Sequence, residues 1–95
     1  MRVKVVFHGS YREVTGFKEK YFQLPENANL LDLLKKLESL YGRELTGQLI
    51  DYKKNEIWSL MAIAVNGKIL SNINKFNCPL NENDEIIFLP PALGG

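Results

Sequence analysis

The 95-residue chain is long enough for one small domain, and its 45% hydrophobic and 24% charged residues are typical of a globular protein rather than a disordered one. Its 12 basic and 11 acidic side chains are interspersed, which disfavours nucleic acid or an anionic membrane as a partner. No segment predicts a signal peptide or a spanning helix, and one cysteine with one histidine makes neither an internal disulfide nor a structural zinc site. We therefore expect a cytoplasmic protein with no nucleic-acid or membrane partner.

The N-terminal segment predicts a β-hairpin. The side chains of residues 2–8 show the period-two alternation of a half-buried strand. The face expected to point inward carries three apolar side chains: Val3, Val5 and Phe7. Residues 9–16 are bounded by glycines and predict a turn or short loop. Residues 18–24 resume the alternation, and Pro25 ends this second strand because it has no N–H to donate to the ladder.

Residues 29–41 predict the main helix. Asn29 is a favourable N-cap, and Gly42 stands where a left-handed C-terminal cap is expected. The apolar residues on one stripe of this helix are Leu30, Leu33, Leu34, Leu37 and Tyr41. Residues 43–58 carry weaker signals, which predict a short helical turn over residues 44–50 and an exposed loop after it.

The C-terminal half predicts a second hairpin and a final strand. Asn66-Gly67 separates two apolar runs, and this pair is the preferred two-residue hairpin turn because both positions need positive φ. An Asn-rich connector leads to the last strand, residues 85–89. The first and last strands are expected to pair in the middle of a mixed sheet with the main helix across one face. This organisation predicts a domain over residues 1–89 and an extended tail over residues 90–95.

The last strand is predicted to carry a partner-binding surface on its outward side. Its inward residues are expected to be Ile86 and Phe88. The residues expected to face outward, directly before the tail, are Ile87 and Leu89 beside Val6 of the first strand. A contiguous exposed apolar patch usually marks an interface. The alternative is that residues 43–58 cover this face through Trp58.

The chain ends on FLPPALGG, a stiff spacer followed by two bare glycines. Pro90 and Pro91 favour an extended exit from the sheet, and six extended residues would reach on the order of 20 Å. Gly94 and Gly95 leave a terminal carboxylate that is open to attack and fits a channel too narrow for side chains.

Four segments together resemble the MoaD/ThiS family of ubiquitin-like sulfur carriers, and most closely its MoaD branch: VKVVFHGSYREVTG, LPENANLLDLLKKLESLY, MAIAVNG and LNENDEIIFLPPALGG. Each segment is a weak signal alone, but the four in this order, with the terminal Gly-Gly, are specific. The resemblance implies an α+β fold, the ubiquitin-like β-grasp, in which one main helix packs across a mixed sheet.

The resemblance also implies chemistry at the terminus. An E1-like, MoeB-like enzyme would adenylate the Gly95 carboxylate with ATP, and a sulfur donor protein would then convert the adenylate to a thiocarboxylate. As the small subunit of a molybdopterin synthase, the chain would donate this sulfur to a pterin precursor inside a larger, MoaE-like subunit. It would bind no cofactor itself and would not be a free-standing enzyme. The tail residues expected to contact partners are Pro90, Pro91, Ala92, Leu93 and Gly94, and Leu93 is larger than the residue often found there.

Other functions stay open at this point. The same activation serves ubiquitin-like modifiers joined through Gly95 to target lysines, and sulfur carriers for thiamine or tRNA; a plain binding module with a passive tail is a third possibility. Cys78 is disfavoured as the carrier because no neighbouring Lys, Arg or His lowers its pKa. His8 has no predicted Ser or Cys partner. Arg12 and Glu13 match the family's first loop and are candidates for orienting a partner.

Overall fold

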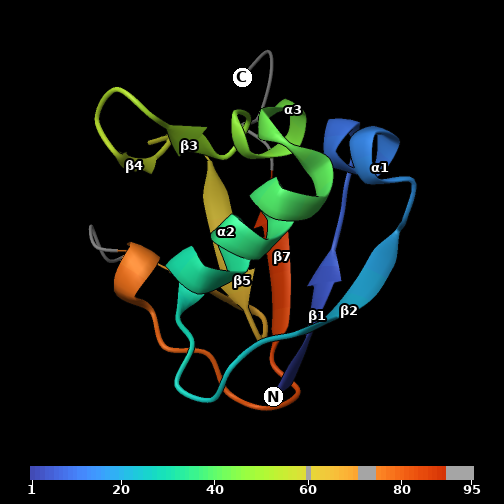
Figure 1. The fold of residues 1–95 in the computed structure, drawn as a ribbon, viewed down its shortest axis with the longest axis vertical. Coiled ribbons are helices and arrows are strands. Elements are labelled where there is room, and N and C mark those ends of the chain that lie inside the picture. Colours follow the sequence, from blue (N-terminus) through green and yellow to red (C-terminus); the bar gives the residue numbers. More distant parts are fainter. Residues whose placement is uncertain (60, 71–74, 90–95) are drawn as a thin grey trace.

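The structure, a computed structural model, describes residues 1–59, 61–70 and 75–89 and contains a five-stranded sheet crossed by one main helix (Figure 1). In chain order its elements are β1 (Arg2–Val6), α1 (Ser10–Thr15), β2 (Glu19–Gln23), α2 (Leu30–Tyr41), α3 (Arg43–Thr46), β3 (Ile50–Asp51), β4 (Glu56–Ile57), β5 (Ala62–Val65), β6 (Lys68–Ile69), the 3₁₀ turn η1 (Lys75–Asn77) and β7 (Glu85–Leu89). The sheet order is β2-β1-β7-β5-β6, while β3 and β4 pair separately.

The first and last strands lie side by side in the middle of the sheet, as the sequence predicts. β1 runs parallel to β7, with Val5 opposite Ile86, and antiparallel to β2. β7 runs antiparallel to β5, with Phe88 opposite Ile63. The result is the mixed sheet of a ubiquitin-like β-grasp fold.

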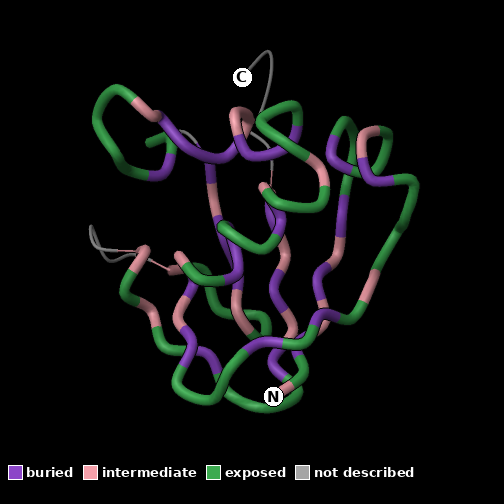
Figure 2. The backbone as a smooth tube through the Cα atoms, in the orientation of Figure 1, coloured by how far each residue is buried: buried purple, intermediate pink, exposed green. Residues whose placement is uncertain are grey.

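The core lies between the sheet and α2, and buried residues alternate with less buried ones along the central strands β1 and β7 (Figure 2). Four leucines of α2 and the predicted inward residues of the first and last strands, including Phe7 directly after β1, are at most 1% exposed: Val3, Val5, Phe7, Ile86, Phe88, Leu30, Leu33, Leu34 and Leu37. Phe7 packs edge-on against Phe22 and against the half-buried Tyr41, with ring centroids 6.4 Å apart in both pairs. Apolar burial of this kind is the main stabilising contribution to a small domain.

Helix α2 begins and ends where its capping residues predict. The Asn29 side chain accepts the Asp32 N–H at 3.0 Å, and the Asp32 carboxylate accepts the Asn29 N–H at 2.9 Å, which completes a capping box. Gly42 has φ 70° as expected, but its ψ of −173° lies outside the left-handed helical region. Its N–H still donates to the Glu38 carbonyl, at 2.8 Å, and so closes the last turn.

The turn predicted over residues 9–16 is wrong, because these residues form helix α1. Tyr11 is 2% exposed and belongs to the core. Gly16 adopts φ 79° and donates its N–H to the Arg12 carbonyl at 2.8 Å, which caps the helix. Burial of the tyrosine ring therefore stabilises a helix too short to show a periodic pattern in the sequence.

The helical turn predicted over residues 44–50 is confirmed in part by α3, but the exposed loop after it is wrong. β3 and β4 form a two-stranded sheet in which Ile50 lies opposite Ile57. These two side chains are only 6% and 7% exposed, so they pack on the core. Strands of two residues are too short for period-two alternation to reveal them.

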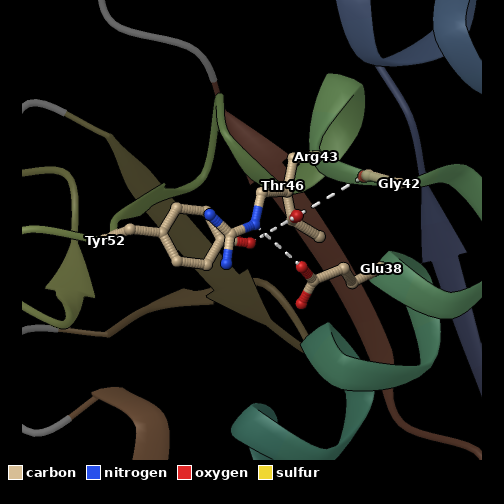
Figure 3. A network of polar contacts seen from close by, with 5 residues as sticks. All are labelled: Glu38, Gly42, Arg43, Thr46 and Tyr52. Carbon is tan, nitrogen blue, oxygen red and sulfur yellow. Dashed lines mark hydrogen bonds and ion pairs between the residues drawn. The ribbon is translucent and has the colours of Figure 1, made fainter.

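Polar contacts fasten this small hairpin to the end of α2 (Figure 3). The Arg43 guanidinium lies 4.0 Å from the centroid of the Tyr52 ring, and its Nε donates to the Glu38 carboxylate at 3.1 Å. The Tyr52 hydroxyl lies 2.6 Å from Thr46 Oγ1, which donates in turn to the Gly42 carbonyl at 3.4 Å. The hairpin is thus held on the helix side of the sheet.

Within the part of the chain that the structure describes, the helices are all too short or too polar to cross a bilayer.

Candidate functional site

The residues predicted to bind a partner meet where β7 ends. Ile87 lies between Val6 of β1 and Ala64 of β5, and Leu89 lies opposite Ala62. The predicted facing of the strand is confirmed, since Ile87, Leu89 and Val6 are half-buried on the side of the sheet away from α2, while their inward neighbours are fully buried. Their role in binding a partner stays a prediction.

The apolar surface extends beyond the three residues that the sequence predicts for it. Ile69 of β6 pairs with Ala64, so its side chain stands on the same face, and it is 63% exposed. We define the apolar patch as Val6, Ala62, Ala64, Ile69, Ile87 and Leu89. The two-residue turn at Asn66-Gly67 was the signal that could have found Ile69, because such a turn fixes which residues oppose each other across the hairpin.

Charged residues fill the other half of the same face. The Lys4 ammonium lies 3.1 Å from the Glu85 carboxylate and 3.6 Å from that of Glu19. The hydrogen bond to Glu85, and then the charge of Glu19, hold the pKa of Lys4 above its ordinary value of 10.5. Beside them the Arg2 guanidinium lies 4.4 Å from the centroid of the Tyr21 ring. The open face is therefore charged where β7 begins and apolar where β7 ends.

A set of hydrogen bonds made by Asn66, which we call the polar brace, sets the register of β7. Asn66 donates from Nδ2 to the buried Asp84 carboxylate at 2.8 Å and accepts the Glu85 N–H on Oδ1 at 2.9 Å. The Asn66 N–H donates to the Glu85 carbonyl at 2.8 Å. Because a slip of one residue would turn every side chain of β7 to the opposite face, this brace also keeps the apolar patch outside.

Residues 43–58 do not cover the apolar patch. Leu45 and Leu49 are fully buried in the core, α3 packs against α2 and α1, and β4 packs against η1, so this segment lies on the helix side. Trp58 is 43% exposed and donates its indole N–H to the Gly47 carbonyl at 3.0 Å. The alternative reading of the outward face is therefore wrong for this segment.

The tail predictions concern residues outside the described part of the chain: Pro90, Pro91, Ala92, Leu93, Gly94 and Gly95. The last described residue is Leu89, which belongs to the apolar patch. A partner that docks on the patch would therefore contact Leu89, the residue that precedes the tail in the sequence.

The structure places Cys78 in a half-buried setting that lowers the fraction of its thiolate form. The residue is half-buried between η1 and the short bridge that joins Pro79 to Asn29. Burial, and then the charge of Asp84, raise the pKa of the Cys78 thiol above its ordinary value of 9.0. Because the thiolate is the nucleophilic form, a raised pKa makes this cysteine a poor sulfur nucleophile.

Arg12 and Glu13 are part of α1 rather than of a loop. Both line an open surface hollow together with Gly9 and Gly16. Because β1 and β7 are parallel, this hollow lies at the same end of the sheet as Leu89. His8 is exposed just before α1, and no described side chain forms a hydrogen bond with its imidazole.

Comparison with known proteins adds sequence and fold relationships. Residues 5–95 match the ThiS family. Small archaeal modifier protein 3 of Haloferax volcanii is 28% identical over 95 residues, which cover 100% of both chains. The solution structure of the Haloferax volcanii HVO 2177 protein is similar with a TM-score of 0.83 and 28% identity, over 100% of this chain and 87% of that one. A putative molybdopterin converting factor, subunit 1, from Pyrococcus furiosus is similar in fold, with a TM-score of 0.71 and 24% identity over 96% of this chain and 98% of that one.

Proposed function

Because this chain belongs to the ThiS family, we propose that it is a sulfur carrier whose reactive group is the Gly95 carboxylate. On an E1-like enzyme a carboxylate oxygen attacks the α-phosphate of ATP, pyrophosphate leaves, and an acyl adenylate forms. The outer sulfur of a persulfide on the donor protein then attacks the acyl carbon, AMP leaves, and an acyl disulfide forms. A second thiol attacks the donor's sulfur in this disulfide, so that Gly95 is released as a thiocarboxylate and the donor and the thiol are left joined as a disulfide.

The observation that supports this proposal is the continuity of the apolar patch with the tail. The patch ends at Leu89, and the residues of the proposed chemistry follow directly. Contacts made away from a reacting group can position that group and lower the entropic cost of its reaction. A partner bound to the patch would hold the start of the tail in a fixed place and direct Gly95 into its own active site.

We further propose that the sulfur goes to a pterin precursor, with this chain as the small subunit of a molybdopterin synthase. The similar structure of the putative molybdopterin converting factor, subunit 1, from Pyrococcus furiosus supports this acceptor. The partners would then be a MoaE-like large subunit, a MoeB-like activating enzyme and a sulfur donor protein. Thiamine and tRNA thiolation use the same activated terminus.

A second candidate is conjugation to proteins. The full-length similarity to small archaeal modifier protein 3 favours it. In this case the amine of a target lysine would attack the Gly95 carbonyl of the acyl adenylate, AMP would leave, the nitrogen would lose a proton, and an isopeptide bond would form. Both candidates need the same patch and the same terminus, and they differ in the nucleophile that receives Gly95.

The shared step is tested by mass spectrometry of the intact protein after incubation with the E1-like enzyme, ATP and a sulfur donor. We expect the mass to rise by one oxygen-for-sulfur exchange, localised to Gly95. Gly94→Val should block the exchange, because a branched Cβ restricts the backbone and obstructs a narrow channel. One residue added after Gly95 should also block it. Gln23→Val, at an exposed strand position at the opposite end of the sheet from Leu89, is the matched control and should react normally.

The acceptor is tested with the thiocarboxylated protein. Conversion of a pterin precursor to a dithiolene in the presence of a MoaE-like subunit supports the synthase role, whereas the C-terminal peptide of this chain joined through Gly95 to lysines of co-expressed proteins supports conjugation. Thiocarboxylation of the extended variant without trimming of the added residue would contradict the terminal-carrier proposal itself.

A further inference from the structure

We propose that β2 pairs antiparallel with the β2 strand of a second copy of this chain and so forms a two-fold dimer with one continuous sheet. β2 lies at the outer margin of the five-stranded sheet, and β1 is its single neighbouring strand in the described structure (Figure 1). β1 also separates β2 from β7, so the dimer does not depend on the chemistry proposed for the tail.

The β1–β2 ladder shows which backbone groups of β2 point outward. Leu24 donates its N–H to the Met1 carbonyl at 2.8 Å, and the Lys18 carbonyl accepts the Phe7 N–H at 2.8 Å. The even-numbered residues of this segment therefore bond to β1, in the register with Val3 opposite Phe22. In an antiparallel ladder the intervening residues direct their N–H and C=O groups to the other side. The residues with outward backbone groups are Glu19, Tyr21 and Gln23, and no hydrogen bond to these groups occurs within residues 1–59, 61–70 and 75–89.

β2 lacks the features that usually protect a free strand edge. Natural edges are kept short, or carry a proline, a bulge or a projecting lysine. The opposite edge follows this rule, since β6 has two residues and begins with Lys68. By contrast, β2 has five residues without a proline and pairs with β1 without a bulge. The ammonium of its single lysine, Lys20, lies 4.4 Å from the centroid of the Phe17 ring, which folds the side chain back over its own molecule.

The charges of β2 select one register for the dimer. With Tyr21 opposite Tyr21 of the second copy, all five residues pair, Glu19 meets Gln23 and Lys20 meets Phe22. If one β2 strand is shifted along the other in one direction, Lys20 comes to lie opposite Lys20 of the second copy. A further shift in the same direction places Glu19 opposite Glu19. Like charges directly opposite each other destabilise a strand pair. A shift in the other direction places Pro25 opposite Glu19, where a backbone N–H is needed.

The side chain at the two-fold axis suits this contact. Tyr21 is 52% exposed, and its ring already packs under the Arg2 guanidinium. In the proposed register two Tyr21 rings become cross-strand neighbours on the open face, and aromatic pairs of this kind stabilise a sheet. A joint between two short strands buries less surface than a standard protein interface, so the dimer should dissociate on dilution.

Sedimentation equilibrium of the full chain tests the proposal. The mass should rise from 10.9 kDa toward twice that value as the concentration increases into the millimolar range. Tyr21→Lys and Tyr21→Glu should each remain monomeric, because like charges then face each other at the axis. An equimolar mixture of these two variants should restore the dimer, because opposite charges meet only in the register with position 21 opposite itself. Ser39→Lys and Ser39→Glu, on the exposed side of α2, should leave self-association unchanged.

Amide hydrogen exchange of the wild-type protein tests the same joint without any substitution. The N–H groups of Glu19, Tyr21 and Gln23 should exchange more slowly at high concentration. A constant mass of 10.9 kDa throughout would overturn the proposal. The proposal would also be wrong if the wild type formed a dimer but the mixture of the two Tyr21 variants did not. It would be wrong as well if these three amides stayed unprotected in the wild-type dimer. Ile87→Glu should still dimerise, so loss of tail function and loss of the dimer are separate outcomes.

Discussion

Two groups of this chain are candidates for carrying the sulfur: the thiol of Cys78 and the carboxylate of Gly95. The structure weakens the case for the thiol, because burial raises its pKa and the nearby Asp84 raises it further. A thiol in that setting is mostly protonated at neutral pH. The proposed function therefore assigns Cys78 no chemical step.

Cys78→Ser should retain sulfur transfer at a rate within about threefold of wild type, because serine keeps the size of the side chain and the proposed sulfur is bound at Gly95. The assay is thiocarboxylate formation followed by mass spectrometry. A serine variant with an unchanged circular dichroism spectrum but no sulfur transfer would identify Cys78 as the carrier instead.

At the scale of the element, β7 combines three tasks in five residues. Its inward side chains complete the core, its outward side chains form the centre of the apolar patch, and its C-terminal end leads into the tail. Alternation along one strand makes this combination possible because successive side chains point to opposite faces. A single outward substitution can therefore test binding without disturbing the core.

Ile87→Glu should leave the domain folded but abolish capture by the large subunit or the activating enzyme, since a charge at the centre of the patch would lose its hydration on docking. Ile69→Glu, at the margin of the patch, should weaken capture less. Gln23→Glu adds the same charge on the same face outside the patch and serves as the control. Unchanged capture by a folded Ile87→Glu protein would show that the partner binds elsewhere.

The hairpin between β5 and β6 depends on Asn66 for two separate reasons. Its side chain bonds to the buried Asp84 and to the Glu85 N–H, and its backbone adopts φ 52°. Asn66→Gly removes only the side-chain bonds, so we expect a loss of about 1–3 kcal/mol in the free energy of unfolding. Asn66→Ala also strains the backbone and should lose about 1–2 kcal/mol more. Urea denaturation measures both, and equal losses would mean that the turn does not require the positive φ.

The elements found from the sequence are those with a long pattern or a specific turn. Alternation identified β1, β2 and β7, the capping residues bounded α2, and Asn66-Gly67 located the second hairpin. α1, β3 and β4 were missed because they are too short for a period to appear, and tertiary contacts such as the burial of Tyr11 stabilise them. Ile69 was not predicted as part of the apolar patch, because its place there follows from pairing across the sheet rather than from its own neighbours in the sequence.

At the scale of the whole molecule, Tyr11 couples stability to alkaline pH. Burial raises the pKa of Tyr11 above its ordinary value of 10.0, because a phenolate in the core would lose its hydration. As the pH rises above 10.0, the unfolded chain releases this proton while the folded chain keeps it. The unfolded state then binds fewer protons, so this contribution to the free energy of unfolding is intact below that pH and decreases above it.

Tyr11→Phe should therefore unfold at a higher alkaline pH than the wild type. At neutral pH the free energies of unfolding of the two proteins should differ less. Thermal denaturation followed by circular dichroism across this range measures the difference. A phenylalanine variant that loses stability with pH as steeply as the wild type would assign the alkaline transition to other groups, among them Lys4, whose pKa is also raised.

The central position of β7 has a mechanical consequence. A pull directed along this strand from Leu89 acts on the parallel ladder with β1 and the antiparallel ladder with β5 at the same time. Force applied in this direction shears many hydrogen bonds together instead of peeling them one after another. A partner that draws the chain into a narrow channel would thus pull on a strand that resists extraction, because β7 is hydrogen-bonded to β1 on one side and to β5 on the other. The same force applied to the two-residue strand β6 would open the sheet from its weakest margin.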